Sequence, residues 1–182
     1  MSEERTAMST LDYLKTPEYN LPREVAHGIV REPPAPFFSH QSVVLQTARI
    51  LCDHVEREHL GRVAVAPVDV VLDRERALIV QPDVLFVSTA RLSIIGDQVW
   101  GAPDLVVEVL SPGSEARDRR EKRGWYRQYG IREYWLIDPA HQRVIVVDFS
   151  GASPEESVAG AQDLVRSSLF PTIQFRPATL FV

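Results

Sequence analysis

The spacing of apolar residues predicts two helices in the first third of the chain. Between residues 39 and 59 the apolar positions recur at a nearly helical period, and Gly61 is a natural stop at the C-terminal end, so we expect a helix over 39–59. A shorter helix is expected to begin at Ser9 or Thr10, which are good N-cap residues, and to end before Pro17.

Short runs rich in β-branched residues, bounded by Pro, Gly or Asp, predict strands in the rest of the chain. The predicted strand segments are 23–32 with a turn near Gly28, 62–72, 77–88, 104–111, 133–138 and 143–150, with strand or hairpin material at 164–175. A charged helix over 117–129, ended by Gly130, separates two of these strands and predicts a βαβ unit. The elements add up to one α/β (α+β) domain over 9–182, with a central mixed β-sheet flanked by helices. A closing helical turn is expected at 176–181 and a disordered lead-in at 1–8.

The composition is typical of a globular domain. Of the 182 residues, 45% are hydrophobic and 25% are charged, and the length is sufficient for one hydrophobic core. Cys52 is the only cysteine and the first ten residues contain no apolar signal-peptide core, so we expect a cytoplasmic protein without disulfides. The apolar runs are too short for a membrane span. Because the net charge is −5, any site for nucleic acid must be a local feature.

Two carboxylates interrupt the otherwise apolar segment APDLVVEVLSP, residues 102–112. Side chains alternate along a strand, so Asp104 and Glu108 share a face, about 13 Å apart, which is too far for both to bind one metal ion at about 2 Å. Asp83 in QPDVLFV is the better partner for Glu108, because the two carboxylates would lie about 5 Å apart if their strands are neighbours. These carboxylates, the backbone carbonyl of Val109, water and phosphate oxygens would suit Mg²⁺ or Mn²⁺.

The helix after the Glu108 strand is basic. Its residues 117–129 contain six Lys and Arg against two acidic residues, a local excess of four positive charges in an acidic protein. We expect Lys122 to fold back towards the carboxylates and to orient a water nucleophile or stabilise charge on a phosphate. The arginines expected to contact DNA phosphates are Arg117, Arg119, Arg120 and Arg123. A solvated helix face without a binding role is the alternative interpretation.

The segments QPDVLFV and GAPDLVVEVLSPGSEARDRREKRGWYRQYGIREYWLIDP resemble the Uma-type putative restriction endonuclease family, a member of the PD-(D/E)xK nuclease superfamily. PPAPFFSHQSVV and LFPTIQFRPATLF extend the resemblance over most of the chain. The resemblance implies a restriction-endonuclease-like fold, with Asp83 as the first metal-binding aspartate and Glu108 as the acidic residue of the second half-motif. In the usual pattern a lysine stands two residues after that glutamate. Here the position is Leu110, and the resemblance implies that Lys122 on the following helix takes its place.

Further polar residues are candidates for a place behind the metal ligands. They are Asp104, Glu24, His40 and Asp118. For Asp104, which follows a proline, we favour local backbone hydrogen bonds, and for Asp118 we favour helix capping. Glu24 and His40 fall where the family has recurring polar residues, although a histidine at a helix start is more often a cap or a surface residue. The aromatic residues between 125 and 135 fit core packing better than stacking on bases.

The main hypothesis is therefore a Mg²⁺- or Mn²⁺-dependent endonuclease that hydrolyses DNA phosphodiester bonds with metal-activated water. It would bind the phosphate backbone, and a homodimer is a reasonable expectation because the superfamily often pairs two active sites. One alternative is a catalytically inactive nuclease-fold module that binds DNA or has a regulatory role. Another is an assembly protein that uses the Tyr- and Trp-rich region as an interface.

Overall fold

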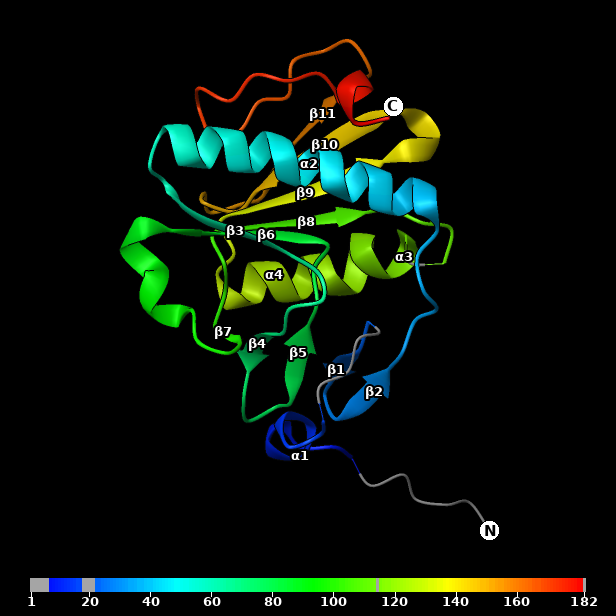
Figure 1. Ribbon diagram of the computed structural model, residues 1–182, viewed down its shortest axis with the longest axis vertical. Coiled ribbons are helices and arrows are strands. Elements are labelled where there is room, and N and C mark those ends of the chain that lie inside the picture. The colour runs from blue at the N-terminus through cyan, green and yellow to red at the C-terminus, as the bar shows by residue number, and fades with distance from the viewer. Residues whose placement is uncertain (1–6, 18–21, 114, 182) are drawn as a thin grey trace.

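In the computed structural model, the described residues 7–17, 22–113 and 115–181 form two β-sheets, with helices on both faces of the larger sheet (Figure 1). Most of the predicted lead-in, residues 1–6, lies outside the described residues. Met8 lies within them and donates its backbone N–H to the carbonyl of Gly28 at 2.9 Å.

The larger sheet has six strands in the order β11-β10-β9-β8-β6-β3. Their bounds are β3 (Gly61–Val65), β6 (Val84–Ser88), β8 (Leu105–Val109), β9 (Glu133–Asp138), β10 (Arg143–Asp148) and β11 (Glu155–Ala159). All neighbours are antiparallel except β8 and β9, which run parallel and are connected by the charged helical segment. The predicted βαβ unit is thus present.

The smaller sheet has five strands in the order β2-β1-β5-β4-β7. Their bounds are β1 (Glu24–Ala26), β2 (Ile29–Arg31), β4 (Val70–Asp73), β5 (Leu78–Val80) and β7 (Val99–Trp100). The sequence predicts one central sheet, but the segments 62–72 and 77–88 each contribute one strand to either sheet. Each segment breaks at a proline, Pro67 or Pro82, since proline has no N–H for a sheet hydrogen bond. The prediction of a mixed α/β fold is confirmed.

Helices cover both faces of the six-stranded sheet (Figure 1). Helix α2 (Phe38–Arg57) lies on one face and ends within two residues of the predicted position. On the other face, α3 (Glu115–Arg117), the π-helical turn η2 (Asp118–Lys122) and α4 (Arg123–Tyr129) form one continuous helical run that ends at Gly130, whose φ is +89°. The short helix α1 (Thr10–Leu14) begins at Ser9, whose hydroxyl accepts from the N–H of Asp12 as an N-cap.

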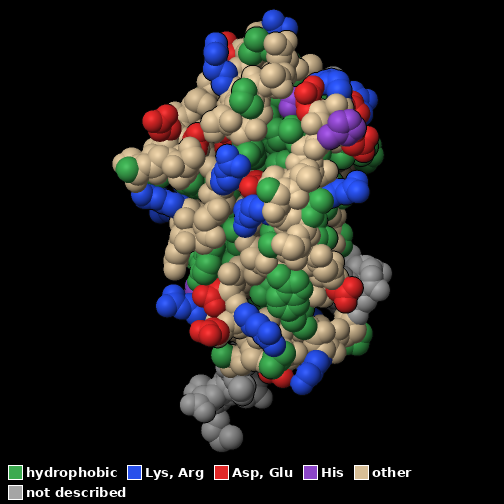
Figure 2. All heavy atoms as spheres, turned by 90° about the vertical axis from the view of Figure 1, so that its left-hand side faces the viewer, with side chains coloured by type: hydrophobic (Ala, Val, Ile, Leu, Met, Phe, Trp, Pro, Cys, Tyr) green, Lys and Arg blue, Asp and Glu red, His purple; other side chains and the backbone are tan. Residues whose placement is uncertain are grey.

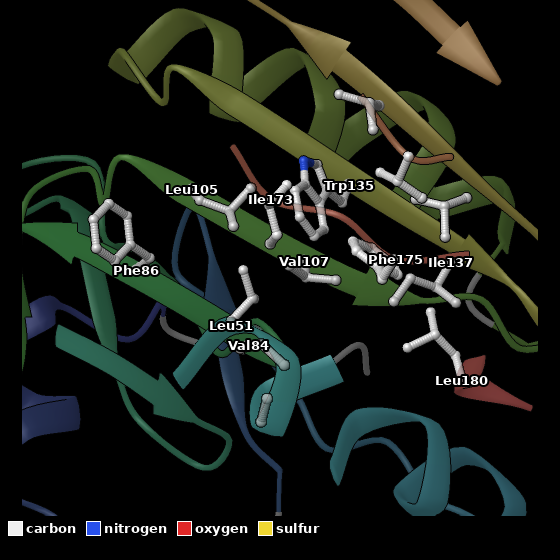
Figure 3. Close-up of a cluster of buried hydrophobic side chains, with 14 of the residues drawn as sticks. Leu51, Val84, Phe86, Leu105, Val107, Trp135, Ile137, Ile173, Phe175 and Leu180 are labelled. Atoms are coloured by element: carbon white, nitrogen blue, oxygen red, sulfur yellow. The ribbon is translucent and has the colours of Figure 1, made fainter. Parts of the chain in front are cut away.

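Alternating side chains build a separate hydrophobic core on each face of this sheet. Val107 and Trp135 face α2 and its neighbours, whereas Val106 and Tyr134 face α4 and the smaller sheet. Figure 3 shows the first of these cores, where Leu51 of α2 lies over the sheet. The side chains of the central strands β8 and β9 are all at most 5% exposed. This close packing on both faces holds the C-terminal end of β8 rigidly in place.

The C-terminal segment differs most from the prediction. Strand β11 (Glu155–Ala159) is not predicted, and the strand or hairpin expected at 164–175 is wrong, because this segment has no regular strand. Instead, the buried carboxylate of Glu133 accepts hydrogen bonds from the hydroxyl of Ser167 at 2.6 Å and the N–H of Ser168 at 2.9 Å. The closing turn is present as the 3-10 helix η4 (Pro177–Leu180). Two further 3-10 helices are η1 (Thr89–Ile94) and η3 (Pro139–His141).

No helix in the described part of the chain is both long enough and apolar enough to cross a membrane.

Candidate active site

The register of β6 and β8 brings Asp83 next to Glu108. The two strands pair antiparallel with Val84 opposite Val107, so the preceding residue Asp83 comes opposite the following residue Glu108. The Oδ2 atom of Asp83 accepts a hydrogen bond from the N–H of Val109 at 2.7 Å. Both carboxylates therefore lie beside the C-terminal end of β8, just before the charged helical segment begins.

Lys122 reaches this edge from η2. Its Nζ lies 2.8 Å from Oε1 of Glu108, 3.0 Å from Oε1 of Glu24 and 3.6 Å from Oδ1 of Asp118. Within the turn 118–122, Asp118 and Lys122 are buried, while the three residues between them are at least partly exposed. The π-helical turn therefore directs one acidic and one basic side chain into the site, and π-helical turns are frequent at functional sites.

Glu24 enters the site from the smaller sheet. Its Oε1 accepts from the N–H of Gln81 at 3.0 Å, and its Oε2 forms a short ion pair with Nη1 of Arg117. Burial opposes ionisation of Glu24, but Lys122 and Arg117 outweigh burial and hold the pKa of Glu24 below its usual value. Glu24 thus connects the two sheets through charges.

Tyr126 is a site residue that the sequence analysis assigns to the core. Its ring packs against Tyr134 with 4.9 Å between ring centroids, and its hydroxyl also donates to Oε1 of Glu108 at 2.7 Å. The signal in the sequence is its spacing, because a residue four positions after Lys122 lies on the same helix face. Lys122 and Tyr126 both donate to Oε1 of Glu108. The other carboxylate oxygen, Oε2, has no hydrogen bond to any described residue.

His40 lies in the first turn of α2 and contacts Asp83 from the opposite side. Its Nε2 is 3.2 Å from Oδ1 of Asp83. Burial lowers the pKa of His40, but the hydrogen bond and attraction to Asp83 outweigh burial, so the pKa is raised. The imidazole is thereby held against the aspartate at the mouth of the site.

The site contains more acidic than basic groups. Four carboxylic acid side chains (Glu24, Asp83, Glu108 and Asp118) share the site with Lys122 and Arg117. Burial raises the pKa of Glu108 well above its usual value, and Lys122 offsets this only in part. The pKa of Lys122 is raised because its acidic neighbours outweigh the effect of burial, so the ammonium stays charged.

The other two candidates, Asp118 and Asp104, lie in different places. Asp118 is part of the cluster and Asp104 lies outside it. Asp118 lies in the first turn of η2, is 2% exposed and has its Oδ1 3.6 Å from Nζ of Lys122, so it belongs to the buried cluster. Asp104 lies at the other end of β8, where it accepts from the N–H of Ser88 at 2.8 Å and is 3.5 Å from Nη1 of Arg91. Asp104 therefore binds a backbone N–H, but that of a residue 16 positions away in the chain and not the local one that the sequence analysis favours.

The four arginines predicted to contact DNA have different surroundings. Arg117 is committed to Glu24 inside the site. Arg119 pairs with Glu115 at 2.8 Å and Arg123 with Glu156 at 2.6 Å, while Arg120 is exposed and has no hydrogen bond or ion pair within the described residues. Arg120 is therefore the best placed of the four to contact a phosphate. Figure 2 shows the side of the molecule that lies on the left in Figure 1, where side chains of both charges are dispersed among hydrophobic ones.

The acidic pair has the donor set of a magnesium site that is completed by other ligands. Among the described residues, no three His, Cys, Asp or Glu side chains are grouped so that they could hold a metal ion. Mg²⁺ commonly binds through only one or two carboxylates, with water and phosphate oxygens as the remaining ligands. Asp83 and Glu108 fit this pattern, because Oε2 of Glu108 lacks a hydrogen bond and the surrounding charge is negative. A contribution from the carbonyl of Val109 stays a prediction.

Comparisons with known proteins agree with this arrangement. No curated protein matches the chain. Among solved structures, the chain is similar to a putative nuclease belonging to DUF820 from Anabaena variabilis ATCC 29413, with 21% identity, 96% of this chain and 97% of that chain covered, and a TM-score of 0.81. That likeness establishes the fold. The family model described as "Uma2: Putative restriction endonuclease" matches residues 11–178, and the chain therefore belongs to the Uma2 family.

Proposed function

We propose that the protein is a divalent-metal-dependent endonuclease that hydrolyses phosphodiester bonds in DNA. The observation that carries the proposal is the pairing of Asp83 and Glu108 at the end of adjacent strands, with Lys122 Nζ 2.8 Å from Glu108. Membership of the Uma2 family supports a nuclease. A Mg²⁺ or Mn²⁺ ion bound by these side chains would relieve the repulsion among the carboxylates.

Asp83 and Glu108 would hold the metal ion, which when bound supplies Lewis-acid polarisation of a phosphate oxygen and lowers the pKa of water. Hydrolysis forms a bond between a water oxygen and phosphorus and breaks the ester bond to the leaving sugar oxygen, which takes up a proton. Lys122 stays charged and is buried, so it can orient the attacking water or stabilise negative charge that develops on the phosphate. Tyr126 and Lys122 fix Oε1 of Glu108, which leaves Oε2 for the metal ion.

Cleavage of DNA with Mg²⁺ or Mn²⁺ tests the proposal when it is compared with an Asp83→Asn variant. Asparagine keeps a carbonyl oxygen for the N–H of Val109 but removes the charge, so the fold should persist while cleavage is lost. Asp148→Asn, at the end of β10 where the carboxylate binds Ser150, is the matched control and should cleave normally. Cleavage that survives Asp83→Asn would contradict the proposal.

A module that binds DNA without turnover is the second candidate. The exposed, unpaired guanidinium of Arg120 would serve binding whether or not the site is catalytic. Two measurements distinguish the two functions. A non-catalytic module would still bind DNA in the presence of a chelator, and it would not cleave DNA with any metal tested.

A further inference from the structure

Two phenylalanines at the start of α2, Phe37 at the N-cap and Phe38 as the first helical residue, are largely exposed to solvent. Phe37 is 81% exposed and Phe38 is 90% exposed. Among the other large hydrophobic side chains in the described ranges, the most exposed is Leu45 at 67%. Exposed apolar side chains of this size commonly mark a binding surface when they occur together.

Neither ring contributes to the stability of the helix. Phe37 occupies the N-cap position and forms no side-chain capping hydrogen bond, although Ser, Thr, Asp or Asn at this position would stabilise the helix. Phe38 is the first helical residue and buries almost none of its surface.

The two phenylalanines come shortly before a residue of the candidate active site in the chain. His40, in the same helical turn, has its Nε2 3.2 Å from Asp83, and one turn of helix rises only about 5.4 Å. The segment before Phe37 starts at β2, where Arg31 lies 3.8 Å from Glu121 of η2. The chain between β2 and α2 therefore runs from η2 to Asp83 along one side of the site (Figure 1).

The chemistry of a phenyl ring limits what can bind there. A ring without polar atoms offers nothing to a phosphate or a sugar hydroxyl, but its face stacks on the face of a nucleobase. Bases within a duplex already stack on their neighbours, whereas an unpaired base has a free face. We propose that Phe37 and Phe38 are a stacking platform for unpaired bases, so that the substrate of this site is single-stranded DNA. This inference rests on the proposed function, because it places the phosphate of that strand at Asp83 and Glu108.

The test is a comparison of DNA affinities by fluorescence anisotropy, with a labelled oligothymidylate and a labelled duplex of mixed sequence. Binding is measured in chelator and with Ca²⁺ in place of Mg²⁺. The variants are Phe37→Ser, Phe38→Ser and the double variant, and Leu45→Ser on the same helix is the matched control, about 10 Å further along. A 2-aminopurine base in the oligonucleotide reports stacking directly through quenching of its fluorescence.

We expect the double variant to bind the single strand at least about fivefold more weakly, with 2-aminopurine quenching lost and duplex affinity unchanged. Leu45→Ser should bind as the wild type does, and Phe37→Ser should melt no lower than the wild type because serine is a good N-cap. Unchanged affinity of the double variant for the single strand would overturn the inference, as would an equal loss of duplex affinity. Conversion of a dimer to a monomer by the double variant would also overturn it, since the rings would then contact a second copy.

The outcomes also separate this inference from the proposed function. Suppose that the wild type cleaves DNA but that the double variant of Phe37 and Phe38 binds single strands as tightly as the wild type does. The nuclease proposal would then stand and the stacking platform would be rejected. Binding that depends on both rings, without cleavage under any metal, would keep the platform and remove the nuclease.

Discussion

Replacing Lys122 with methionine should destabilise the protein in a way that depends on pH and metal. Methionine keeps most of the side-chain volume, so the change removes a charge rather than packing. The Nζ lies within 3.6 Å of three carboxylates, those of Glu24, Glu108 and Asp118. Removing one partner of a buried ion pair costs about 3–5 kcal/mol, which corresponds to a fall in melting temperature of about 6–20 °C for a domain of this size.

The sign of the pH dependence follows from the same contacts. Without Lys122 the folded-state pKa of Glu108, which is already raised, rises further, and that of Glu24 rises from its lowered value. A carboxylate with a raised folded pKa contributes stability below its unfolded pKa of about 4.3 and loses it as the pH rises through the folded value. The penalty of Lys122→Met should therefore be largest near pH 8 and smaller near pH 5, and Mn²⁺ should reduce it by binding the carboxylates.

Urea denaturation of the wild type and Lys122→Met, at both pH values and with Mn²⁺ or chelator, provides the measurement. The matched control is Lys15→Met, which removes the only other lysine of the chain from an exposed position and should change stability little. Equal stability of Lys122→Met and the wild type at pH 8 in chelator would refute the reasoning, as would a penalty that grows towards pH 5.

Three further predictions concern neighbouring groups. Tyr126→Phe should lower the free energy of unfolding by about 1.5–3 kcal/mol, because it removes a buried hydrogen bond to a carboxylate while keeping the ring; a urea denaturation curve identical to that of the wild type would contradict this. Because the pKa of Glu108 is raised, Mn²⁺ must displace a proton from this side chain at pH values below that pKa. Calorimetry in that range should show an Mn²⁺ affinity that rises with pH by up to about tenfold per pH unit, and an affinity independent of pH would contradict this prediction. Arg120→Ser should weaken DNA binding and reduce the slope of log affinity against log salt by about one, whereas Arg127→Ser, at an exposed position that contacts Ala152, should not; equal salt slopes in all three proteins would contradict a phosphate contact.

The strands and the acidic pair could be predicted from the sequence because their signals are local. The β-branched run around Val107 and the proline before Asp83 locate the ends of two strands, and neighbouring antiparallel strands then bring Asp83 opposite Glu108. The split into two sheets cannot be predicted in the same way, because the segments interrupted by Pro67 and Pro82 have the pattern of continuous apolar runs.

The rest of the site depends on contacts that local patterns do not contain. Glu24 reaches Lys122 only because the smaller sheet packs beside the end of β8, and nothing around Glu24 in the sequence indicates this. For Asp118 the local pattern indicates only a carboxylate that the helix dipole favours near a helix start, and it does not indicate that the side chain is buried against Lys122. The charge of Arg117 predicts a contact with DNA, but Arg117 lies in α3 and forms an ion pair with Glu24 of the smaller sheet.

Titration calorimetry of Mn²⁺ into the wild type, Glu108→Gln and Asp104→Asn tests the central claim most directly. Glu108→Gln keeps the shape of the side chain, and Asp104→Asn changes a carboxylate on the same strand at its other end. We expect the wild type and Asp104→Asn to bind Mn²⁺ alike and Glu108→Gln to bind at least about tenfold more weakly, as loss of one of two carboxylate ligands requires. Equal binding by Glu108→Gln and the wild type, or no binding by the wild type, would contradict a metal site built on Asp83 and Glu108.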